Sequence, residues 1–215
     1  AKGSTEQKLS DLYKLSMDEA RRNKEGVQPL MPMLNKMEKA KTTADLFKIQ
    51  LELVPMGDSE FIGTYVAADE KNAKQNILYV AQSGITLRQK EYYLDADSAT
   101  TAIREAYKKH IVNMFKKFGF SESAAQKKMQ NIMKLETELA KVSKSNTELR
   151  DPEANYHKMT YAEFNKKYPH IQLEKQLLAA GVNLNYVKDL VVGQPEFVEG
   201  ADKLISNLTP AEFRD

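Results

Sequence analysis

The sequence has no cysteine or tryptophan, only three histidines and only nine glycines among its 215 residues. Without cysteine, the chain can form no disulfide, no thiolate metal site, no iron–sulfur cluster and no cysteine nucleophile. The few glycines are scattered, which excludes a phosphate-binding loop and a dinucleotide-binding Gly-x-Gly-x-x-Gly motif. No apolar run approaches the roughly 18 residues that span a bilayer. The first residues form no hydrophobic signal segment, so we expect an export signal to have been removed or never present.

The charge is nearly balanced, with 32 Lys and Arg against 30 Asp and Glu and a net charge of +2. A dedicated nucleic-acid-binding protein usually carries a strong basic excess, so we expect no nucleic-acid partner. The hydrophobic fraction of 41% is sufficient for a core, and the length is typical of one domain. We therefore expect residues 1–215 to form a single folded domain.

Apolar residues recur mostly at helical spacing, which predicts a mainly α fold. The two longest predicted helices cover residues 98–118 and 122–142, and the short connection at Gly119 predicts that they pack antiparallel. A short extended segment is expected at 190–192. Shorter helices are predicted over residues 4–23, 30–40, 42–54, 161–169, 171–180 and 195–207.

Between these helices the apolar period changes from 3.6 to 2, which is typical of strands. Residues 61–67 and 76–82 are predicted to pair as one small antiparallel β-hairpin. The charged segment 68–75 between them is expected to be a solvated loop. Because an isolated hairpin is only marginally stable, it must pack against the helices.

The C-terminal residues carry another helix-start signal. Thr209 is a candidate N-cap, Pro210 suits the first helical position and Glu212 completes a capping box, yet the chain stops at Asp215. A single helical turn without tertiary contacts does not hold itself, because nucleation costs more than one hydrogen bond returns. We therefore expect the polypeptide to be a piece of a longer one.

No sequence-local catalytic or metal-binding motif is present, and no His-Glu-x-x-His occurs. His110 lies on the predicted apolar stripe of its helix and is expected to be a core or interface residue, while His157 and His170 fit surface or turn positions. Glu136 and Glu138 could be proposed as paired acids, but solvated helix faces explain them better. The residues alone therefore predict no catalytic, metal or cofactor site.

Two stretches carry a family resemblance. The Tyr-Tyr motif comprises residues 76–87, Asn-Ile-Leu-Tyr-Val-Ala-Gln-Ser-Gly-Ile-Thr-Leu, followed by Tyr92 and Tyr93. The Arg-Asp-Pro motif is Glu-Leu-Arg-Asp-Pro-Glu-Ala-Asn-Tyr-His-Lys-Met-Thr over residues 148–160. Together they resemble the N-terminal region of the neprilysin and endothelin-converting-enzyme family of zinc metallopeptidases, which includes bacterial PepO-type enzymes. Weaker similarity over residues 191–197 extends the resemblance to nearly the whole chain.

This sequence departs from the family pattern at two positions. Arg88 stands where the family usually has proline, and His157 stands where it usually has asparagine. The resemblance implies a two-domain zinc endopeptidase in which a largely helical domain faces a thermolysin-like catalytic domain across a closed chamber. This chain resembles much of the helical domain, so zinc would belong to the parent enzyme and not to this piece.

The resemblance further implies what the piece does. It would gate access to the substrate chamber and would be inactive alone. Its partners would be the missing catalytic domain and peptide substrates, and the parent would be exported. The motif residues that we single out as structural or interdomain are Tyr92, Tyr93, Arg150, Asp151, Pro152, Tyr156, Lys158, Met159 and Thr160.

The residue types in the Arg-Asp-Pro motif suggest structural tasks. Asp151 is expected to cap a short helix begun by Pro152, and Thr160 to cap the next helix with Glu163. Further expected roles are core anchoring between two short helices for Tyr156 and Met159, and bonding to helix-end carbonyls or the partner domain for Arg150 and Lys158.

The alternative is a stand-alone helical module that binds a protein partner. That hypothesis predicts a closed surface and a C-terminus that ends naturally. The gating-domain hypothesis predicts instead an exposed apolar patch where missing parts dock.

Overall fold

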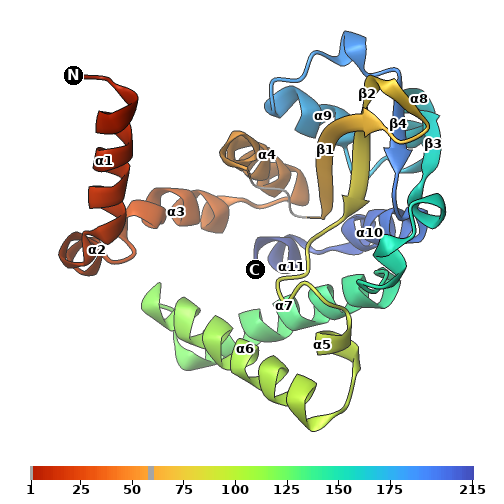
Figure 1. Ribbon diagram of the computed structural model, residues 1–215. Coiled ribbons are helices and arrows are strands. Elements are labelled where there is room, and N and C mark those ends of the chain that lie inside the picture. The colour runs from red at the N-terminus through yellow and green to blue at the C-terminus, as the bar shows by residue number, and fades with distance from the viewer. Residues whose placement is uncertain (1, 58–60) are drawn as a thin grey trace. The chain divides into compact units, whose positions relative to one another are not determined.

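The computed structural model describes residues 2–57 and 61–215, and most of them are helical, which confirms the mainly α prediction (Figure 1). The chain divides into two compact units, Ala1–Lys39 and Ala40–Asp215. None of the helices within the described ranges is long and apolar enough to cross a membrane.

The first unit is built from short helices that bury none of their side chains. They are α1 (Thr5–Met17), α2 (Glu19–Glu25), the 3₁₀ turn η1 (Gln28–Leu30) and α3 (Met31–Lys39). The prediction of one helix over residues 4–23 was wrong, because Asp18 leaves helical geometry with φ −77° and ψ 76°. The Asp18 carboxylate accepts a bond from the Arg21 amide (2.9 Å) and so begins α2.

An apolar face runs along α1 and is exposed within the described structure. Its large side chains are Leu9, Leu12, Tyr13 and Met17, which the helical repeat places on one side of the helix. The helical stripe predicted from the sequence is therefore present, but the first unit provides nothing that covers it.

The second unit contains one four-stranded mixed sheet. Its strands are β1 (Ile62–Asp69), β2 (Asn72–Gln82), β3 (His157–Thr160) and β4 (Asp189–Val192), arranged in the order β1-β2-β4-β3. β1 pairs antiparallel with β2, β2 pairs parallel with β4, and β4 pairs antiparallel with β3. Figure 1 shows the long β1–β2 hairpin beside the two short strands.

The predicted hairpin is confirmed, but the solvated loop over residues 68–75 was wrong. The strands continue through most of that segment and leave only Glu70 and Lys71 as the turn. The Asp69 carboxylate closes the turn by accepting a bond from the Lys71 amide (2.9 Å). Polar residues can extend β2 because its first five positions are exposed to water.

Helices and 3₁₀ turns make up most of the remaining described part of the second unit. They are α4 (Thr43–Leu53), η2 (Val54–Met56), α5 (Glu91–Leu94), α6 (Ser98–Lys117), α7 (Glu122–Val142), η3 (Glu148–Arg150), η4 (Glu153–Asn155), α8 (Tyr161–Lys167), α9 (Leu173–Ala179), η5 (Leu184–Tyr186), α10 (Pro195–Asn207) and α11 (Pro210–Arg214). The long pair α6 and α7 matches the predicted boundaries within a residue, and Gly119 turns the chain between them at φ +93°.

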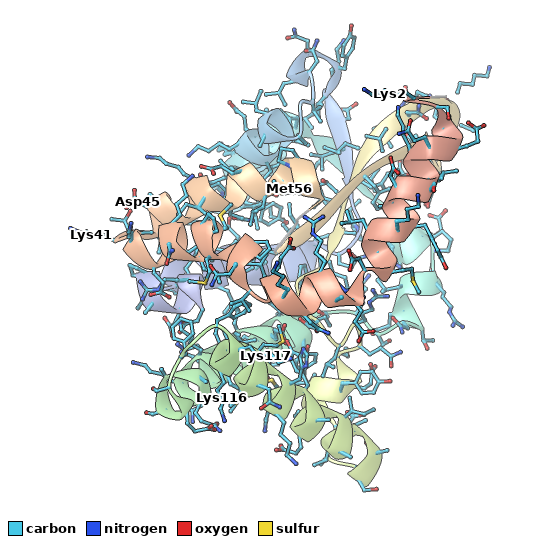
Figure 2. The ribbon with its side chains drawn as sticks, turned by 90° about the vertical axis from the view of Figure 1, so that its left-hand side faces the viewer. Lys2, Lys41, Asp45, Met56, Lys116 and Lys117 are labelled. Atoms are coloured by element: carbon cyan, nitrogen blue, oxygen red, sulfur yellow. The ribbon has the colours of Figure 1, made fainter. Side chains whose placement is uncertain are left out.

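Side chains at the helix ends complement the helix dipole. Figure 2 shows Asp45 at the start of α4, where it forms a capping box with Thr42. The same view places Lys116 and Lys117 in the last turn of α6, where positive charge is favourable.

The described residues of the second unit form three clusters of buried side chains, of which the smallest lies within the sheet and the other two involve helices. The larger of these two lies between the sheet and helices α7 to α10 and includes Ile62, Val80, Leu139, Phe164, Leu190 and Phe197. The smaller of these two joins α5, α6 and α7 through Tyr93, Ile111, Met133 and Ala140. Because α7 supplies residues to both of them, it couples the helix pair to the sheet.

The first half of α6 departs from its predicted stripe. Ala102, Ile103, Ala106 and His110 are exposed, and α6 buries only Ile111 and Val112. His110 is therefore not a core residue, and the other part of the expectation, an interface position, stays a prediction. Ala99, Ala102 and Ala106 on this face offer little area to bury, so spacing alone overstated its contribution to the core.

The last helix, α11, is held by contacts from elsewhere in the second unit. Phe213 packs on Phe61 with ring centroids 6.0 Å apart, and Lys134 pairs with Glu212 at 2.9 Å. The Asn131 amide also donates to the Asp215 carboxylate (2.7 Å). Tertiary packing therefore supplies the stability that an isolated helical turn lacks.

The close approach of α10 to α7 generates a test of packing. A Cβ added at Gly200 would lie 2.8 and 2.9 Å from the two methyl carbons of Val142. Overpacking costs typically about 1–3 kcal/mol, and exchanging glycine for alanine in a helix returns about 1 kcal/mol. We expect Gly200→Ala to lower the free energy of unfolding by up to about 2 kcal/mol, measured by urea denaturation.

The matched background is Val142→Ala, which removes both methyl groups. In that background Gly200→Ala should become neutral or stabilising. An equal loss in both backgrounds would show that the contact with Val142 is not the cause.

Candidate functional site

The hairpin turn and the Arg-Asp-Pro motif meet around one buried carboxylate. Asp69 is 1% exposed. Its Oδ1 accepts bonds from the Lys71 amide (2.9 Å) and the Tyr156 hydroxyl (2.7 Å). Its Oδ2 accepts from Gln75 Nε2 (3.2 Å) and Lys158 Nζ (3.1 Å). Two residues of the motif thereby fix the end of a hairpin that lies nearly 90 residues earlier in the chain.

The electrostatics of this Asp69 cluster follow from its donors. The hydroxyl of Tyr156, followed by the Lys71 amide and the Lys158 ammonium, holds the pKa of Asp69 well below its usual range. Desolvation and the adjacent carboxylate raise the pKa of Tyr156 to about 12. The Lys71 ammonium lies 4.8 Å from the centroid of the Tyr156 ring. The Asp69 cluster therefore connects the hairpin to the Arg-Asp-Pro motif through a carboxylate that stays ionised.

The structure assigns the other motif residues to local structure. Asp151 accepts a bond from the Ala154 amide (3.1 Å), but the 3₁₀ turn η4 begins at Glu153 with Pro152 at its N-cap, one residue later than predicted. Thr160 forms a capping box with Glu163 at the start of α8, as predicted. The Thr160 cap is thus confirmed, and Asp151 makes a cap-like bond at a turn that begins one residue later than predicted.

Other expectations for this motif were wrong in detail. Residues 157–160 form strand β3, so Tyr156 and Met159 do not anchor a pair of short helices. Tyr156 is half-buried beside Ile77, Tyr79 and Val191 on the sheet. Met159 is half-buried against the larger core cluster.

The two basic residues of the motif have different surroundings. Lys158 bonds the Asp69 carboxylate and no helix-end carbonyl. Arg150 is exposed at the end of η3. Its availability for a partner domain stays a prediction.

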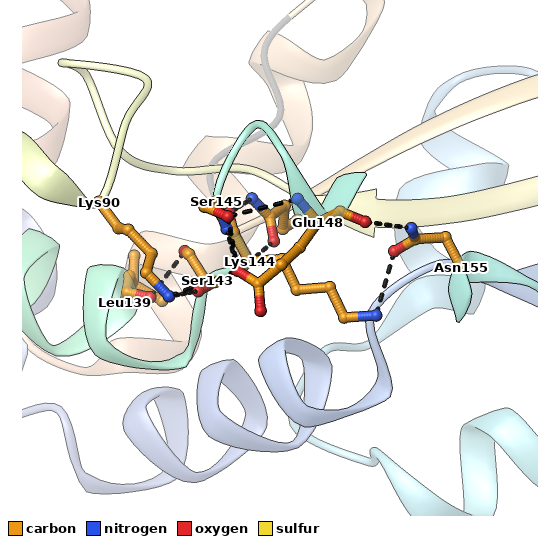
Figure 3. Close-up of polar contacts among 8 residues, drawn as sticks. Lys90, Leu139, Ser143, Lys144, Ser145, Glu148 and Asn155 are labelled. Carbon is orange, nitrogen blue, oxygen red and sulfur yellow. Dashed lines mark hydrogen bonds and ion pairs between the residues drawn. The ribbon is translucent and has the colours of Figure 1, made fainter. Parts of the chain in front are cut away.

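A second polar cluster centres on Lys144 and Asn155 (Figure 3). Lys144 Nζ donates to the Ala154 carbonyl (2.8 Å) and to Asn155 Oδ1 (3.2 Å). The Asn155 amide donates back to the carbonyls of Glu148 (2.8 Å) and Asp151 (2.7 Å). Sequence reasoning missed Lys144, because no local pattern shows that a lysine will bond the carbonyls of a loop ten residues away.

Gln194 extends this cluster into the sheet. Its Nε2 donates to Asn155 Oδ1 (3.0 Å), and its Oε1 accepts from the Gln82 amide (2.8 Å). The Gln82 side chain in turn exchanges two bonds with the backbone of Lys144, at 2.8 and 2.9 Å. The end of α7, the Arg-Asp-Pro motif and the end of β2 are thus tied together through amide side chains.

The Tyr-Tyr motif surrounds a third buried group, Glu136 of α7, which is 6% exposed. The hydroxyls of Tyr93 (2.7 Å) and Tyr107 (3.1 Å) donate to its carboxylate. Thr86 donates from its hydroxyl (2.6 Å) and its amide (3.3 Å). The interpretation of Glu136 as part of a solvated helix face was therefore wrong. Burial, with Glu136 adding to it, raises the pKa of Tyr93 well above its usual range.

Tyr92 differs from Tyr93. Its side chain is only half-buried, and its backbone carbonyl accepts a bond from Arg104 Nε (2.7 Å). Tyr93 therefore contributes a buried hydroxyl to the Glu136 cluster, and Tyr92 contributes a backbone carbonyl that binds Arg104 of α6.

These clusters hold the fold together and do not assemble reactive chemistry. Among residues 2–57 and 61–215, no group of three or more His, Asp or Glu side chains is placed to hold a metal ion. The ligand set expected for a catalytic zinc is thus not offered by the described part of the chain.

The Asp69 cluster predicts an acid-dependent contribution to stability. Because the pKa of Asp69 is depressed in the folded state, its stabilising effect is present above the unfolded value of about 3.9 and is lost as the pH falls below it. Asp69→Asn should lower the free energy of unfolding at pH 7, and its difference from wild type should shrink below about pH 4. Urea unfolding from pH 3 to pH 7 measures this.

Two tyrosine variants provide the matched comparison. Tyr156→Phe removes one donor to Asp69. Its difference from wild type in unfolding free energy should therefore also shrink at low pH, but by less than that of Asp69→Asn. Tyr186→Phe, at a position 85% exposed, should leave the curve unchanged. A loss at Asp69→Asn that is the same at pH 3 and pH 7 would contradict the assignment.

The Glu136 cluster predicts a large loss on truncation. Glu136→Ala leaves the hydroxyls of Tyr93 and Tyr107 without their acceptor inside the protein, which should cost about 3 kcal/mol of unfolding free energy. Glu138→Ala is the control on the same helix, because the Glu138 side chain is 42% exposed and its ion pair with Lys141 is screened by water, so the change should cost less than about 0.5 kcal/mol. Thermal and urea denaturation compare the two, and equal losses would refute the buried role of Glu136.

Comparison with known proteins shows similarity over almost the whole chain. The model of peptidase family M13 matches residues 1–214. Endothelin-converting enzyme 1 of Cavia porcellus is 31% identical over 210 residues, covering 94% of this chain and 28% of that enzyme. The human enzyme of the same name is 30% identical, covering 94% of this chain and 27% of that enzyme.

Solved structures agree. The zinc metalloprotease Zmp1 of Mycobacterium tuberculosis, in complex with an inhibitor, superposes with a TM-score of 0.89 at 28% identity. The match covers 99% of this chain and 32% of that one. PepO from Lactobacillus rhamnosis shares the fold, with a TM-score of 0.74 at 19% identity over 92% of this chain and 30% of that one.

The chain spans less than a third of the length of these relatives. The matched part includes both sequence motifs and the polar clusters built on them. The chain belongs to peptidase family M13, a family of zinc metallopeptidases, and corresponds to its N-terminal domain.

Proposed function

We propose that this chain is the gating part of a zinc endopeptidase, closing over a catalytic domain elsewhere in the polypeptide and limiting substrates to peptides. One observation carries the proposal: residues 1–214 match the M13 family, yet the sequence holds no His-Glu-x-x-His motif. The ligands for zinc and the general base would therefore come from the rest of the parent protein. By the same reasoning, the chain alone should neither bind catalytic zinc nor cleave peptides.

Opening and closing are supported by the relatives. Zmp1 has been solved in an open state and in a partial open state, and this chain matches those structures with TM-scores of 0.86 and 0.74. Domain closure moves packed bodies about a few hinge residues. The Asp69, Asn155 and Glu136 clusters tie the second unit together at three places, which suits a body that moves as one piece.

An uncovered apolar surface is also consistent with a larger assembly. The exposed face of α1 carries Leu9, Leu12, Tyr13 and Met17. Contiguous exposed apolar side chains mark interaction sites more often than free surface. We assign this face to contact with other parts of the parent protein.

Export of the parent protein is proposed from the family resemblance alone. Fractionation of the source cells, with an antibody against this chain, tests it. Recovery only with cytosolic proteins would contradict it.

The isolated chain is expected to be inactive for a definite reason, the lack of zinc ligands. The purified 215-residue chain should carry no stoichiometric zinc by metal analysis and should not hydrolyse a fluorogenic decapeptide. The full polypeptide encoded by the same gene is the matched control, and it should bind zinc and hydrolyse the decapeptide. Zinc-dependent cleavage by the isolated chain would refute the assignment.

Size limitation is tested on the full polypeptide. It should cleave a decapeptide rapidly and the same ten residues poorly when they are placed in an unfolded chain of about 100 residues. Equal rates per site on the two substrates would refute the gating role and leave the family assignment unchanged.

A further inference from the structure

The outer edge of β1 has no partner strand among the described residues. β1 lies at the end of the strand order and pairs only with β2. Its middle segment, Gly63 to Ala68, contains neither a charged residue nor proline. Edge strands are ordinarily protected by charges, prolines or covering elements, because their free N–H and C=O groups accept any extended chain.

Two large apolar side chains project from this unprotected edge. Tyr65 is 53% exposed and Val66 is 64% exposed, and they point to opposite faces of the sheet because side chains alternate along a strand. Tyr65 is stacked on Tyr79 of β2, with ring centroids 5.1 Å apart and planes within 3°. The edge therefore presents a fixed aromatic surface beside open backbone groups.

A cavity lies on the Tyr65 face of the sheet. It has a volume of about 280 Å³, and its walls include Tyr65, Tyr79, Glu70, Leu149, Pro152 and Gln194. Glu70 is the only charged residue among those lining it. The lining thus combines aromatic and apolar side chains with the amides of Gln82, Asn155 and Gln194 and one negative charge.

We propose that the β1 edge binds an extended peptide segment as an added strand and that a basic side chain of this peptide enters the cavity. The proposal rests on the proposed function, since peptides would be the substrates of the parent enzyme. Main-chain pairing accepts segments of varied sequence, and a pocket for one side chain supplies selectivity.

Charge complementarity selects this occupant. A side chain on the Tyr65 face of the added strand lies next to the Tyr65 ring, because neighbouring strands are about 4.8 Å apart. A long basic side chain crosses that ring, with which its cation interacts favourably, and extends toward Glu70. An acidic side chain in the same place would be repelled.

The test uses the full 215-residue chain and fluorescein-labelled nonapeptides of alternating Thr and Val, with Arg, Ala or Glu at the central position. Fluorescence anisotropy should show the Arg peptide binding about tenfold more tightly than the Ala peptide, and the Glu peptide more weakly still. N-methylation of alternate amides facing β1 should abolish binding, because it removes the ladder hydrogen bonds.

Three variants separate the parts of the site. Tyr65→Lys places a charge on the edge and should weaken binding of the Arg peptide at least about tenfold, whereas Tyr186→Lys, at an exposed site outside the sheet, should not. Glu70→Gln should reduce the preference for Arg over Ala without preventing binding of the Ala peptide. Circular dichroism checks that each variant is folded.

Other occupants give different results, and each would overturn the proposal. If a second copy covers the edge, sedimentation will show dimers that Tyr65→Lys dissociates. If the parent polypeptide covers it, the isolated chain will bind the Arg peptide and the full polypeptide will not. Absence of binding, or binding that Tyr65→Lys leaves unchanged, also overturns it. None of these outcomes affects the tests of zinc content and substrate size.

Discussion

The parallel pairing of β2 with β4 is the interaction on which the rest of the second unit depends. Residues 78–80 lie opposite residues 190–192, which are more than 100 residues later in the chain. Val80, Leu190, Val191 and Val192 are fully buried, as expected for a parallel pair covered on both faces. The pairing sets the position of β3 on one side and of the hairpin on the other. It also places Gly193 so that its amide bonds the Val80 carbonyl at 2.8 Å and leads into Gln194.

The two sequence motifs gain a physical meaning from this arrangement. The Arg-Asp-Pro motif provides Tyr156 and Lys158 to Asp69, and Asn155 to the cluster with Gln194. The Tyr-Tyr motif provides Tyr93 to Glu136 of α7. Each contact joins segments that local structure would leave independent. A buried carboxylate that accepts three or four bonds is costly to leave unpaired, so such contacts define one arrangement of the segments more sharply than apolar packing does.

Sequence reasoning succeeded where the signal was local. The boundaries of α6 and α7, the Thr160 and Thr209 capping boxes and the hairpin all follow from periodicity and capping residues. It failed where a long-range partner decides the structure. β3 has four residues and exists because β4 lies beside it, and Glu136 is buried because Tyr93 and Tyr107 approach α7. Neither partner is visible within a window of sequence.

The difference between buried polar contacts and exposed apolar surface bears on function. A domain that moves over a catalytic partner, as proposed, has to keep its own shape while its contacts change, because interfaces switch between discrete arrangements and packed cores do not deform continuously. The buried joints at Asp69, Asn155 and Glu136 lie where strands, turns and helices of the second unit meet, and breaking any of them would expose a charged or amide group without its partners. Exposed apolar side chains on α1 and along β1 carry no such penalty when their surroundings change. The buried polar groups therefore keep the shape of the second unit, and the exposed apolar surface is the part whose contacts can change.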